Sequence, residues 1–275
     1  MKNNNKFALV TGASAGIGAE YAYQLAVKWN YNLVVSARRG EQLESLKSNI
    51  LKQFANGVEW KPEIITITAD LSKSEGVMEL IAMIEKHGVS IDLLVNNAGF
   101  GSLVGFADSS INWETDMVKV NCLAPLMLTH HFLPKMLERK GCGIINVCST
   151  AAFQPIPFMA TYGATKSFLY NFTRAVAKEV QGKGVTVMAN CPGPTESEFF
   201  KVVGLDSKVP FMPGMTSREV VCQALKGYHK GKRVVINGLV NKLCVFLGRY
   251  LPTEWTLSII MRAKEGRLVV KGKPI

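Results

Sequence analysis

Short apolar runs alternate with longer segments of helical period along this 275-residue chain. The first run, Phe7 to Thr11, leads through a glycine-rich turn into a segment with Ile17, Tyr21, Leu25 and Trp29 on one side, as in an amphipathic helix. Strands that alternate with helices indicate an α/β fold, and this length fits one large α/β domain over residues 1–275, with a core at 6–237. The pattern predicts strands at 7–11, 32–37, 64–69, 91–95, 143–148, 185–190 and 234–236, and later helices at 74–87, 113–139 and 162–181.

The C-terminal stretch, residues 238–275, departs from this pattern. Two apolar and basic helical segments are expected at 239–249 and 253–264. From residue 226 onward there are eleven Lys or Arg residues and two acidic ones, so most of the net charge of +11 lies here. The extension is expected to pack on the core or across a subunit interface, or else to rest on an anionic membrane surface. The basic charge also suits nucleic acid, but no recognition motif accompanies it, so nucleic acid is not expected.

The composition narrows the class of protein. With 48% hydrophobic and 19% charged residues, the chain can bury a large core and does not resemble a disordered protein. No apolar run reaches the ~18 residues that span a bilayer, and residues 1–12 lack the core of a signal peptide. We therefore expect a soluble, cytoplasmic protein, with membrane association through the extension as the alternative. The cysteines lack zinc-ligand spacing and are expected to be buried free thiols: Cys122, Cys142, Cys148, Cys191, Cys222 and Cys244.

The turn after the first predicted strand reads Gly-Ala-Ser-Ala-Gly-Ile-Gly over residues 12–18. Glycines permit a tight turn and close backbone approach, and the N-terminus of the next helix offers unpaired N–H groups to a pyrophosphate. Because this turn lies between a strand and a helix, we expect it to bind a dinucleotide. The candidate cofactor-binding residues in it are Gly12, Ser14, Ala15, Gly16, Ile17 and Gly18.

The end of the second predicted strand bears on the choice of dinucleotide. A domain that prefers NAD(H) usually places an acidic residue here, where it binds the ribose hydroxyls. Residues 36–40 contain no acid and carry Arg38 and Arg39 instead. Guanidinium groups suit a 2′-phosphate, so NADP(H) is favoured over NAD(H).

Two further strand ends carry candidate cofactor contacts. An Asp follows the third strand, in the crevice where such sheets bind ligands. Two Asn residues and two small residues follow the fourth, where the amides can hold neighbouring strand ends while a cofactor passes close to the small residues. The candidates here are Asp70, Leu71, Asn97, Ala98 and Gly99.

The helix predicted at 113–139 contains Asn121 and, four residues later, Pro125. Proline has no N–H with which to bond the carbonyl of Asn121, so we expect a kink at this point. An Asn at a kink that faces the site could anchor a water chain. The alternative is a solvent-facing Asn beside an incidental proline.

The most informative stretch runs from Ser149 to Lys166. Tyr162 and Lys166 are four residues apart, so on a helix they lie on one face. An ammonium group near a phenol favours the phenolate and lowers the phenol's pKa, which suits general acid–base chemistry. Ser149, at a strand end, could hold the same substrate oxygen. The alternative is an ordinary Tyr–Lys pair on a helix surface.

Together these segments resemble the short-chain dehydrogenase/reductase (SDR) family over residues 6 to about 240. The resemblance implies a doubly wound, Rossmann-like, mostly parallel sheet with helices on both faces, and a nicotinamide cofactor across the strand ends. The C-terminal extension is similar in part to that of long-chain 3-oxoacyl reductases. The motifs occur in the family's order: TGASAGIG (11–18), NNAG (96–99), Asn121, Ser149, Tyr162 with Lys166, and Pro192-Gly193.

The resemblance assigns roles to the catalytic candidates. It implies that Tyr162 is the general acid/base and that Ser149 orients the substrate oxygen. Lys166 would bind the nicotinamide ribose and lower the pKa of the tyrosine, and Asn121 would hold a water of the proton relay.

The turn after the sixth strand departs slightly from the family's PG-x-V-x-T pattern. It reads Pro192-Gly193-Pro-Thr-Glu-Ser, so Ser197 takes the place of the threonine and Thr195 that of the valine. A serine can make the same hydrogen bond to the nicotinamide amide. Many NADP-dependent relatives also have a basic residue where this chain has Ala15, so the preference for NADP(H) depends on the two arginines.

Residues 195–215 are rich in Phe, Val and Met and correspond to the family's substrate lid. This content suggests an acyl, fatty or steroid-like substrate, or simply a lid that packs shut. The sequence thus predicts an NADP(H)-dependent carbonyl reductase that, like its family, forms a homodimer or homotetramer. The alternative is a dinucleotide-sensing or scaffold protein without turnover, which the intact Ser, Tyr, Lys and Asn set argues against.

Overall fold

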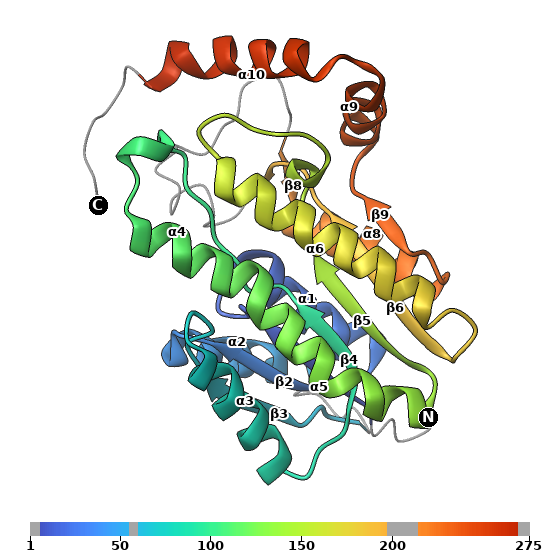
Figure 1. Ribbon diagram of the computed structural model, residues 1–275. Coiled ribbons are helices and arrows are strands. Elements are labelled where there is room, and N and C mark those ends of the chain that lie inside the picture. Colours follow the sequence, from blue (N-terminus) through green and yellow to red (C-terminus); the bar gives the residue numbers. More distant parts are fainter. Residues whose placement is uncertain (1–5, 55–59, 197–213, 269–275) are drawn as a thin grey trace.

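The computed structural model describes residues 6–54, 60–196 and 214–268 (Figure 1). Its centre is a parallel seven-stranded sheet in the order β3-β2-β1-β4-β5-β6-β9. The predicted strands are confirmed, with ends that differ by one residue at most. Their bounds are β1 Phe7–Thr11, β2 Asn32–Ala37, β3 Ile64–Thr68, β4 Ile91–Asn96, β5 Cys142–Val147, β6 Val185–Cys191 and β9 Val234–Ile236.

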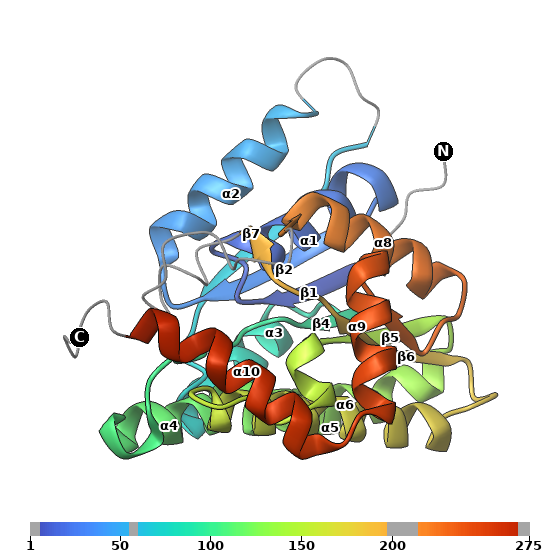
Figure 2. The ribbon, with the colours of Figure 1, turned by 90° about the horizontal axis from the view of Figure 1, so that it is seen from above.

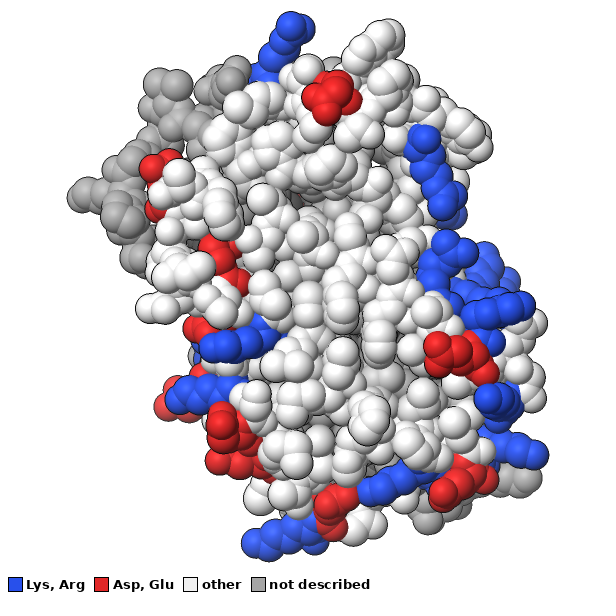
Figure 3. Space-filling view, viewed as in Figure 1, with Lys and Arg blue, Asp and Glu red and all other residues white. Residues whose placement is uncertain are grey.

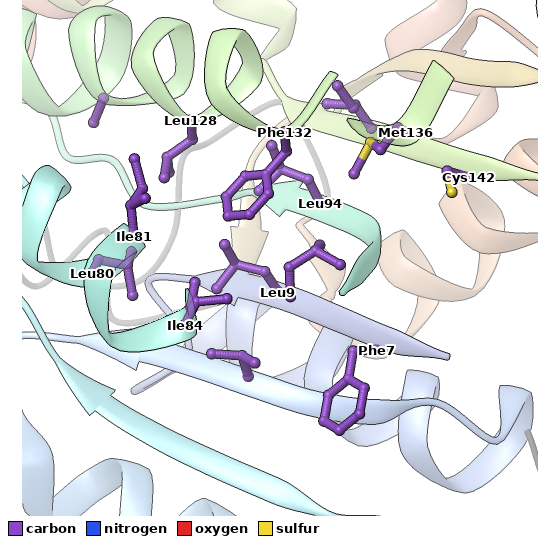
Figure 4. Packing of buried hydrophobic residues seen from close by; sticks show 14 of the residues in the cluster. Phe7, Leu9, Leu80, Ile81, Ile84, Leu94, Leu128, Phe132, Met136 and Cys142 are labelled. Atoms are coloured by element: carbon purple, nitrogen blue, oxygen red, sulfur yellow. The ribbon is translucent and has the colours of Figure 1, made fainter. Parts of the chain in front are cut away.

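Helices cover both faces of the sheet, as expected for a doubly wound fold (Figure 1). One core cluster joins β1 and β4 to the helices α3, α5 and α6, and a second joins the other face to α1, α2 and α8. Figure 4 shows side chains of the first cluster pointing toward one another, with Phe132 above Leu9 and Ile84 to its left. The bounds are α1 Gly16–Trp29, α2 Gly40–Lys52, α3 Ser74–Lys86, α5 Ala124–Arg139, α6 Ala160–Glu179 and α8 Ser217–His229.

Two of these helices, α2 and α8, were not predicted from the sequence. The second begins with a capping box, in which the Thr216 hydroxyl accepts from the backbone N–H of Glu219 and the Glu219 carboxylate accepts from the backbone N–H of Thr216. A Thr followed three residues later by a Glu is a readable signal for a helix start. It follows the small two-stranded sheet of β7 (Thr195–Glu196) and β8 (Met215–Thr216).

The helix predicted at 113–139 is not continuous. It consists of α4 (Ile111–Val118), a π-helical turn (Lys119–Leu123) and α5. The turn contains Asn121 and ends two residues before Pro125. The expected irregularity is therefore confirmed, and it takes the form of a π-helical turn, which is common at functional sites.

The C-terminal extension forms α9 (Leu239–Tyr250) and α10 (Thr253–Leu268), which lie beyond the carboxyl ends of the strands (Figures 1 and 2). One side of α9 packs on the core. There Asn241 is buried and donates to the backbone oxygen of Asn237 (2.7 Å), and Gly248 approaches Gln154. Among the described residues, no helix is both long and apolar enough to cross a bilayer.

The prediction that all cysteines are buried is wrong in part. All six are free thiols, and Cys142, Cys148 and Cys191 lie buried at strand ends. Cys244, by contrast, is exposed on α9, and Cys122 and Cys222 are half-buried on helices. A helix has one face toward solvent, whereas these central strands are covered on both faces.

Candidate active site

The structure gathers most of the predicted site residues at one edge of the sheet. The glycine turn follows β1, Asn97 to Gly99 follow β4, Ser149 follows β5 and Pro192-Gly193 follow β6. In parallel strands these carboxyl ends meet at the same edge, so residues far apart in sequence share one crevice. Tyr162 and Lys166 reach it from the first turns of α6.

The glycine turn is closely packed against the end of β4. Gly12 has a φ of +66° and Gly16 one of +57°, which glycine adopts readily. A Cβ on Gly18 would lie 2.2 Å from the backbone oxygen of Gly12 and 2.4 Å from Nδ2 of Asn97, so only glycine fits there. Ser14, Ala15 and Ile17 lie between these glycines.

The first turn of α1 has the features of an anion site. Its N-cap residue, Ala15, has no side chain able to accept a hydrogen bond from the helix, and the first turn contains no acidic residue. The first N–H groups of a helix have no partner within the helix. Here they point toward the crevice with the positive end of the helix dipole, which suits a phosphate.

The amide of Asn97 fixes the glycine turn to the neighbouring strand, as the sequence suggested. Its Nδ2 donates to the backbone oxygens of Thr11 (2.9 Å) and Gly12 (3.2 Å). The hydroxyl of Thr11, which the sequence analysis did not single out, accepts from the backbone N–H groups of Asn97 (3.0 Å) and Ala98 (3.1 Å). These bonds hold the ends of β1 and β4 in register.

A second set of buried amides links β4 and β5 to the helices. Asn96 donates to Asn146 (2.8 Å) and to the hydroxyl of Thr129 on α5 (3.3 Å), and Asn146 donates to the hydroxyl of Thr173 on α6 (2.8 Å). Asn96 was part of the NNAG motif, but Asn146 and the two threonines were not singled out from the sequence. A polar residue inside an otherwise apolar strand was the available signal, because a buried amide needs a partner.

Ser149 and Tyr162 meet through their side chains. Ser149 caps a short 3-10 helix, Thr150–Phe153, by accepting from the backbone N–H of Ala151 (3.1 Å). Its side chain also forms a hydrogen bond with the phenol of Tyr162. The hydroxyl groups of the two residues therefore lie together, as the sequence predicted.

Lys166 lies one helical turn after Tyr162 and is buried. Its Nζ donates to the backbone oxygen of Val147 (2.9 Å) and lies 5.8 Å from the centroid of the Tyr162 ring. A Cβ on Gly99 would come within 3.3 Å of the ammonium, so the loop after β4 passes directly beside it. The predicted proximity of phenol and ammonium is confirmed.

The prediction that the Lys166 ammonium lowers the pKa of the Tyr162 phenol is wrong for the surroundings that the structure describes. Burial raises the pKa of Tyr162 to about 12, although the hydrogen bond with Ser149 acts in the opposite direction. Burial also lowers the pKa of Lys166. The ammonium lies over the face of the ring and bonds to Val147, so it does not offset the loss of solvent around the hydroxyl.

Asn121 is fully buried in the π-helical turn, and its side chain is held by protein atoms. Its Oδ1 accepts from the backbone N–H of Phe100 (3.1 Å). Its Nδ2 donates to the backbone oxygen of Phe100 (2.9 Å) and to the hydroxyl of Thr165 (3.0 Å). The amide therefore connects α6 to the loop after β4, so a water on Asn121 would have to bind its backbone.

Thr165 completes this connection and was missed by the sequence analysis. Its hydroxyl donates to the backbone oxygen of Tyr162 (2.8 Å) while it accepts from Asn121. Thr165 is buried, although it lies in a helix, where a hydroxyl is usually solvated. Its place directly before Lys166 was the only signal in the sequence.

The two arginines after β2 are exposed and border the glycine turn. Arg39 donates to the hydroxyl of Ser14 from NH2 (3.1 Å) and from Nε (3.3 Å). Asp70 accepts from the backbone N–H and the hydroxyl of Ser72. Burial acts to raise the pKa of Asp70, but these bonds and the charge of Arg38 outweigh it, so the pKa lies below its usual value. Leu71 beside it is buried.

The turn after β6 is partly described. The backbone oxygen of Pro192 accepts from the backbone N–H of Thr150 (2.9 Å), and the Thr195 hydroxyl donates to the backbone oxygen of Gly193 (2.9 Å). Asn241 of α9 covers Gly193, where a Cβ would lie 2.3 Å from its Nδ2. Ser197 and most of the predicted lid, 195–215, lie outside the described residues. Among those described, no His, Cys, Asp and Glu residues cluster as a metal site would require.

Comparison with known proteins agrees with this arrangement. The family model for short chain dehydrogenases matches residues 6–207. A very-long-chain 3-oxoacyl-CoA reductase of Pyrenophora tritici-repentis is 34% identical over 66% of this chain, which spans 52% of that reductase. Serine 3-dehydrogenase of Rhizobium radiobacter is 36% identical over 70% of this chain and 72% of its own length. Human dehydrogenase/reductase SDR family member 7 is 33% identical over 93% of this chain and 77% of its own length.

Solved structures share the whole fold. A short-chain dehydrogenase from Sphingobium yanoikuyae in complex with NADPH is 25% identical, covers 98% of both chains and has a TM-score of 0.77. The bulky-bulky ketone specific alcohol dehydrogenase of Comamonas testosteroni is 27% identical over 98% of this chain and 96% of its own, with a TM-score of 0.72. The similarity therefore includes the C-terminal part of the chain.

Proposed function

The chain belongs to the short-chain dehydrogenase/reductase family, and from this membership we propose that it is an NADP(H)-dependent oxidoreductase that interconverts a carbonyl and an alcohol. The observation that carries the proposal is the convergence of Ser149, Tyr162 and Lys166 beside the glycine turn. Each comes from a different strand end or helix turn, and together they provide a hydrogen-bond donor, a proton donor and a cation.

The residues of the crevice fit a dinucleotide. The uncapped first turn of α1 and the tight glycine turn suit a pyrophosphate. One N–H of the Lys166 ammonium donates to Val147, which leaves two for the hydroxyls of a ribose. When bound, the nicotinamide supplies the hydride chemistry, and the protein supplies binding, orientation and charge.

The protein's own part in the reaction is to hold the substrate oxygen and move one proton. The Ser149 hydroxyl and the Tyr162 phenol, which bond each other, would both bond the substrate oxygen. In reduction, Tyr162 gives its proton to the developing alkoxide, and in oxidation it takes the proton of the alcohol. The Lys166 ammonium, which lies 5.8 Å from the centroid of the Tyr162 ring, would meet part of the charge that forms when the proton leaves, and Asn121 holds the loop after β4 in place.

The preference for NADP(H) over NAD(H) is supported by Arg38 and Arg39. Both are exposed beside the glycine turn, and Arg39 already contacts Ser14 in it. A 2′-phosphate on the adenosine ribose would place its charge near these guanidinium groups, which bind phosphate well. The structural neighbour from Sphingobium yanoikuyae, in complex with NADPH, is consistent with this choice.

An apolar substrate is supported by the surroundings of Tyr162. Its ring belongs to a cluster with Met117 and Ala151, against which Phe100, Ile156 and Met159 pack. Such walls favour a fatty, acyl or steroid-like carbonyl compound, because they remove apolar surface from water. The reductase of Pyrenophora tritici-repentis is named for a very-long-chain 3-oxoacyl-CoA.

A homo-oligomer is supported by the outer surface of α5 and α6. Figure 3 shows a broad uncharged band over these helices, with charged side chains along its borders. Leu123 of the π-helical turn, Leu126 of α5 and Phe168 of α6 are each 37–42% exposed here. An exposed apolar patch with polar borders is typical of a protein–protein interface. Two copies that meet through this face would form a symmetric interface of the same patch.

Substitution of Tyr162 by Phe tests the reaction. The variant is expected to bind NADPH as the parent does, measured by fluorescence titration, and to lose at least about 100-fold in kcat toward a ketone panel. Tyr170→Phe on the same helix is the matched control and is expected to retain activity. Turnover by Tyr162→Phe at the parent rate would refute the assigned role. NADPH binding by the parent without turnover of any compound, 3-oxoacyl thioesters included, would favour the non-catalytic alternative.

Substitution of Arg38 by Asp tests cofactor choice. It is expected to weaken NADPH binding by at least about tenfold and leave NADH binding nearly unchanged, because only the former carries the 2′-phosphate. Arg218→Asp, an exposed arginine on α8, serves as the control. Equal losses for the two nucleotides would contradict the assignment.

A further inference from the structure

Lysines line a cavity beside β9, the edge strand of the sheet. The cavity has a volume of about 340 Å³ and lies between α8, β9 and the start of α9. None of its lysines forms an ion pair with a residue that the structure describes. They are Lys226, Lys230, Lys232 and Lys242.

Positive charge continues on the other side of the same strand. A second cavity of about 330 Å³ is lined by Arg174, Lys178 and Arg233, and it shares Val234 with the first. Figure 3 shows Lys and Arg side chains gathered along the border where Figure 1 places β9 and the end of α6. The edge of the sheet is therefore strongly basic.

Next to this edge, α9 turns an apolar stripe toward solvent. Leu239, Leu243, Phe246 and Tyr250 follow helical spacing, and each is 57–81% exposed. The opposite side of α9 is held to the core by Asn241. The helix is thus amphipathic, but its apolar side faces outward, which is costly in water unless something covers it.

The basic edge and the stripe are continuous. Leu239 and Lys242 of α9 both line the lysine cavity, and Leu239 begins the stripe. Beyond the stripe, the exposed side chains of Leu251 and Trp255 extend the apolar surface toward α10. Tyr and Trp are the aromatic residues preferred at the boundary between lipid and water.

We propose that this surface, the stripe of α9 together with the lysine cavity, docks the protein on an anionic membrane. The apolar side chains enter the headgroup region, and the lysines contact anionic headgroups. Charge complementarity selects this occupant over a second copy, because two such surfaces would bring like charges together. A nucleic acid would match the lysines but would leave the stripe uncovered.

Docking in this way gives the site access to lipid. Figures 1 and 2 place α9 and α10 beyond the carboxyl ends of the strands, on the side where Ser149 and Tyr162 lie. If the proposed function holds, an apolar carbonyl substrate would reach the crevice from the membrane. The docking itself does not depend on the reaction.

Vesicle flotation of the full-length protein tests the proposal without an activity assay. The protein is expected to float with phosphatidylcholine vesicles that contain phosphatidylserine, and to remain largely free with phosphatidylcholine alone. Phe246→Glu is expected to abolish flotation, and Lys230→Gln with Lys232→Gln to weaken it about 30-fold, since each lysine near an anionic surface contributes about fivefold. High salt should weaken binding further.

Matched variants on α3 and α2 separate docking from general effects. Met78→Glu replaces an apolar side chain that is 56% exposed, and Lys52→Gln with Lys86→Gln removes two exposed charges. Both are expected to float like the parent. All variants should keep the parent's melting temperature, because the changed side chains are exposed, and its turnover of a soluble ketone.

Three results would overturn the proposal. The first is a parent protein that stays free with anionic vesicles. The second is equal flotation with neutral vesicles, which would remove the role of the lysines. The third is a smaller assembly for Phe246→Glu by light scattering without vesicle binding, which would show that the stripe joins copies of this chain. None of these results bears on whether Tyr162 is catalytic.

Discussion

Substitution of Thr165 by Val tests whether the Asn121 amide is positioned from α6. The change keeps the volume and branching of the side chain but replaces the hydroxyl by a methyl group. It removes the bond that Thr165 accepts from Asn121 (3.0 Å) and the one that it donates to the backbone of Tyr162 (2.8 Å). Asn121 and Tyr162 are both buried, so water does not replace the hydroxyl that they lose as a partner.

The expected magnitude follows from these contacts. Nδ2 of Asn121 keeps its bond to Phe100 but loses a partner for its second N–H. A buried donor without a partner costs about 1–3 kcal/mol, so we expect a loss of about 2 kcal/mol in the free energy of unfolding. For a domain of this size, that lowers the melting temperature by roughly 4–8 °C. A shift of the amide and the π-helical turn should reduce kcat by about 10- to 100-fold, because small displacements of a positioned group are costly.

Calorimetry and steady-state kinetics with a soluble ketone would measure both effects, and Thr165→Ser is the control. The serine keeps the hydroxyl and loses one methyl group, at a cost of about 1 kcal/mol in stability. Its kcat should therefore stay close to that of the parent, and the KM for NADPH should not change in either variant. Equal losses of kcat in the valine and serine variants would refute the reasoning, since the methyl group rather than the hydroxyl would then matter.

Three further predictions concern the packing and ionisation of other residues. Gly18→Ala should weaken NADPH binding at least about tenfold and lower the melting temperature, because its Cβ would clash with Gly12 and Asn97. Gly163→Ala, where the nearest atom would be 3.7 Å away, should instead stabilise α6 by about 0.5–1 kcal/mol, measured by denaturant unfolding. Burial raises the pKa of Tyr31 to about 12. The neutral phenol therefore makes its full contribution to the free energy of unfolding below pH 10, and this contribution is lost as the pH rises toward 12. Tyr31→Phe should remove about 2 kcal/mol of that alkaline loss, and an unchanged stability profile between pH 9 and 12 would contradict the assignment.

The positions of the strands along the chain and the placement of the site were predictable because they depend on local patterns, whereas the order of the strands in the sheet was not predicted. Each central strand is an apolar run of five to seven residues covered on both faces, and each ends in a change to glycine or polar residues. The carboxyl ends of parallel strands meet, so Asn97 and Ser149 could be placed together without coordinates. The spacing of Tyr162 and Lys166 needed only the helical period.

What the sequence did not predict depends on contacts between distant segments. Thr165 and Asn146 are ordinary polar residues until the fold brings partners within 3.0 Å of them. The raised pKa of Tyr162 likewise depends on burial, which no local pattern reports. The outward apolar side of α9 was also hidden, because an amphipathic pattern shows that a helix has two faces but not which one meets the core.

The raised phenol pKa bears on the protonation state of Tyr162 in the proposed reaction. A proton donor must carry its proton before the transfer, and a pKa of about 12 keeps Tyr162 protonated at neutral pH. Reduction uses this neutral phenol, whereas oxidation needs the phenolate, which burial disfavours. Ser149 offsets the effect in part through its hydrogen bond, and Lys166 would meet the charge that appears when the proton leaves. The residues around the phenol thus favour its neutral form, and Lys166 is placed to meet the charge that forms when the proton leaves.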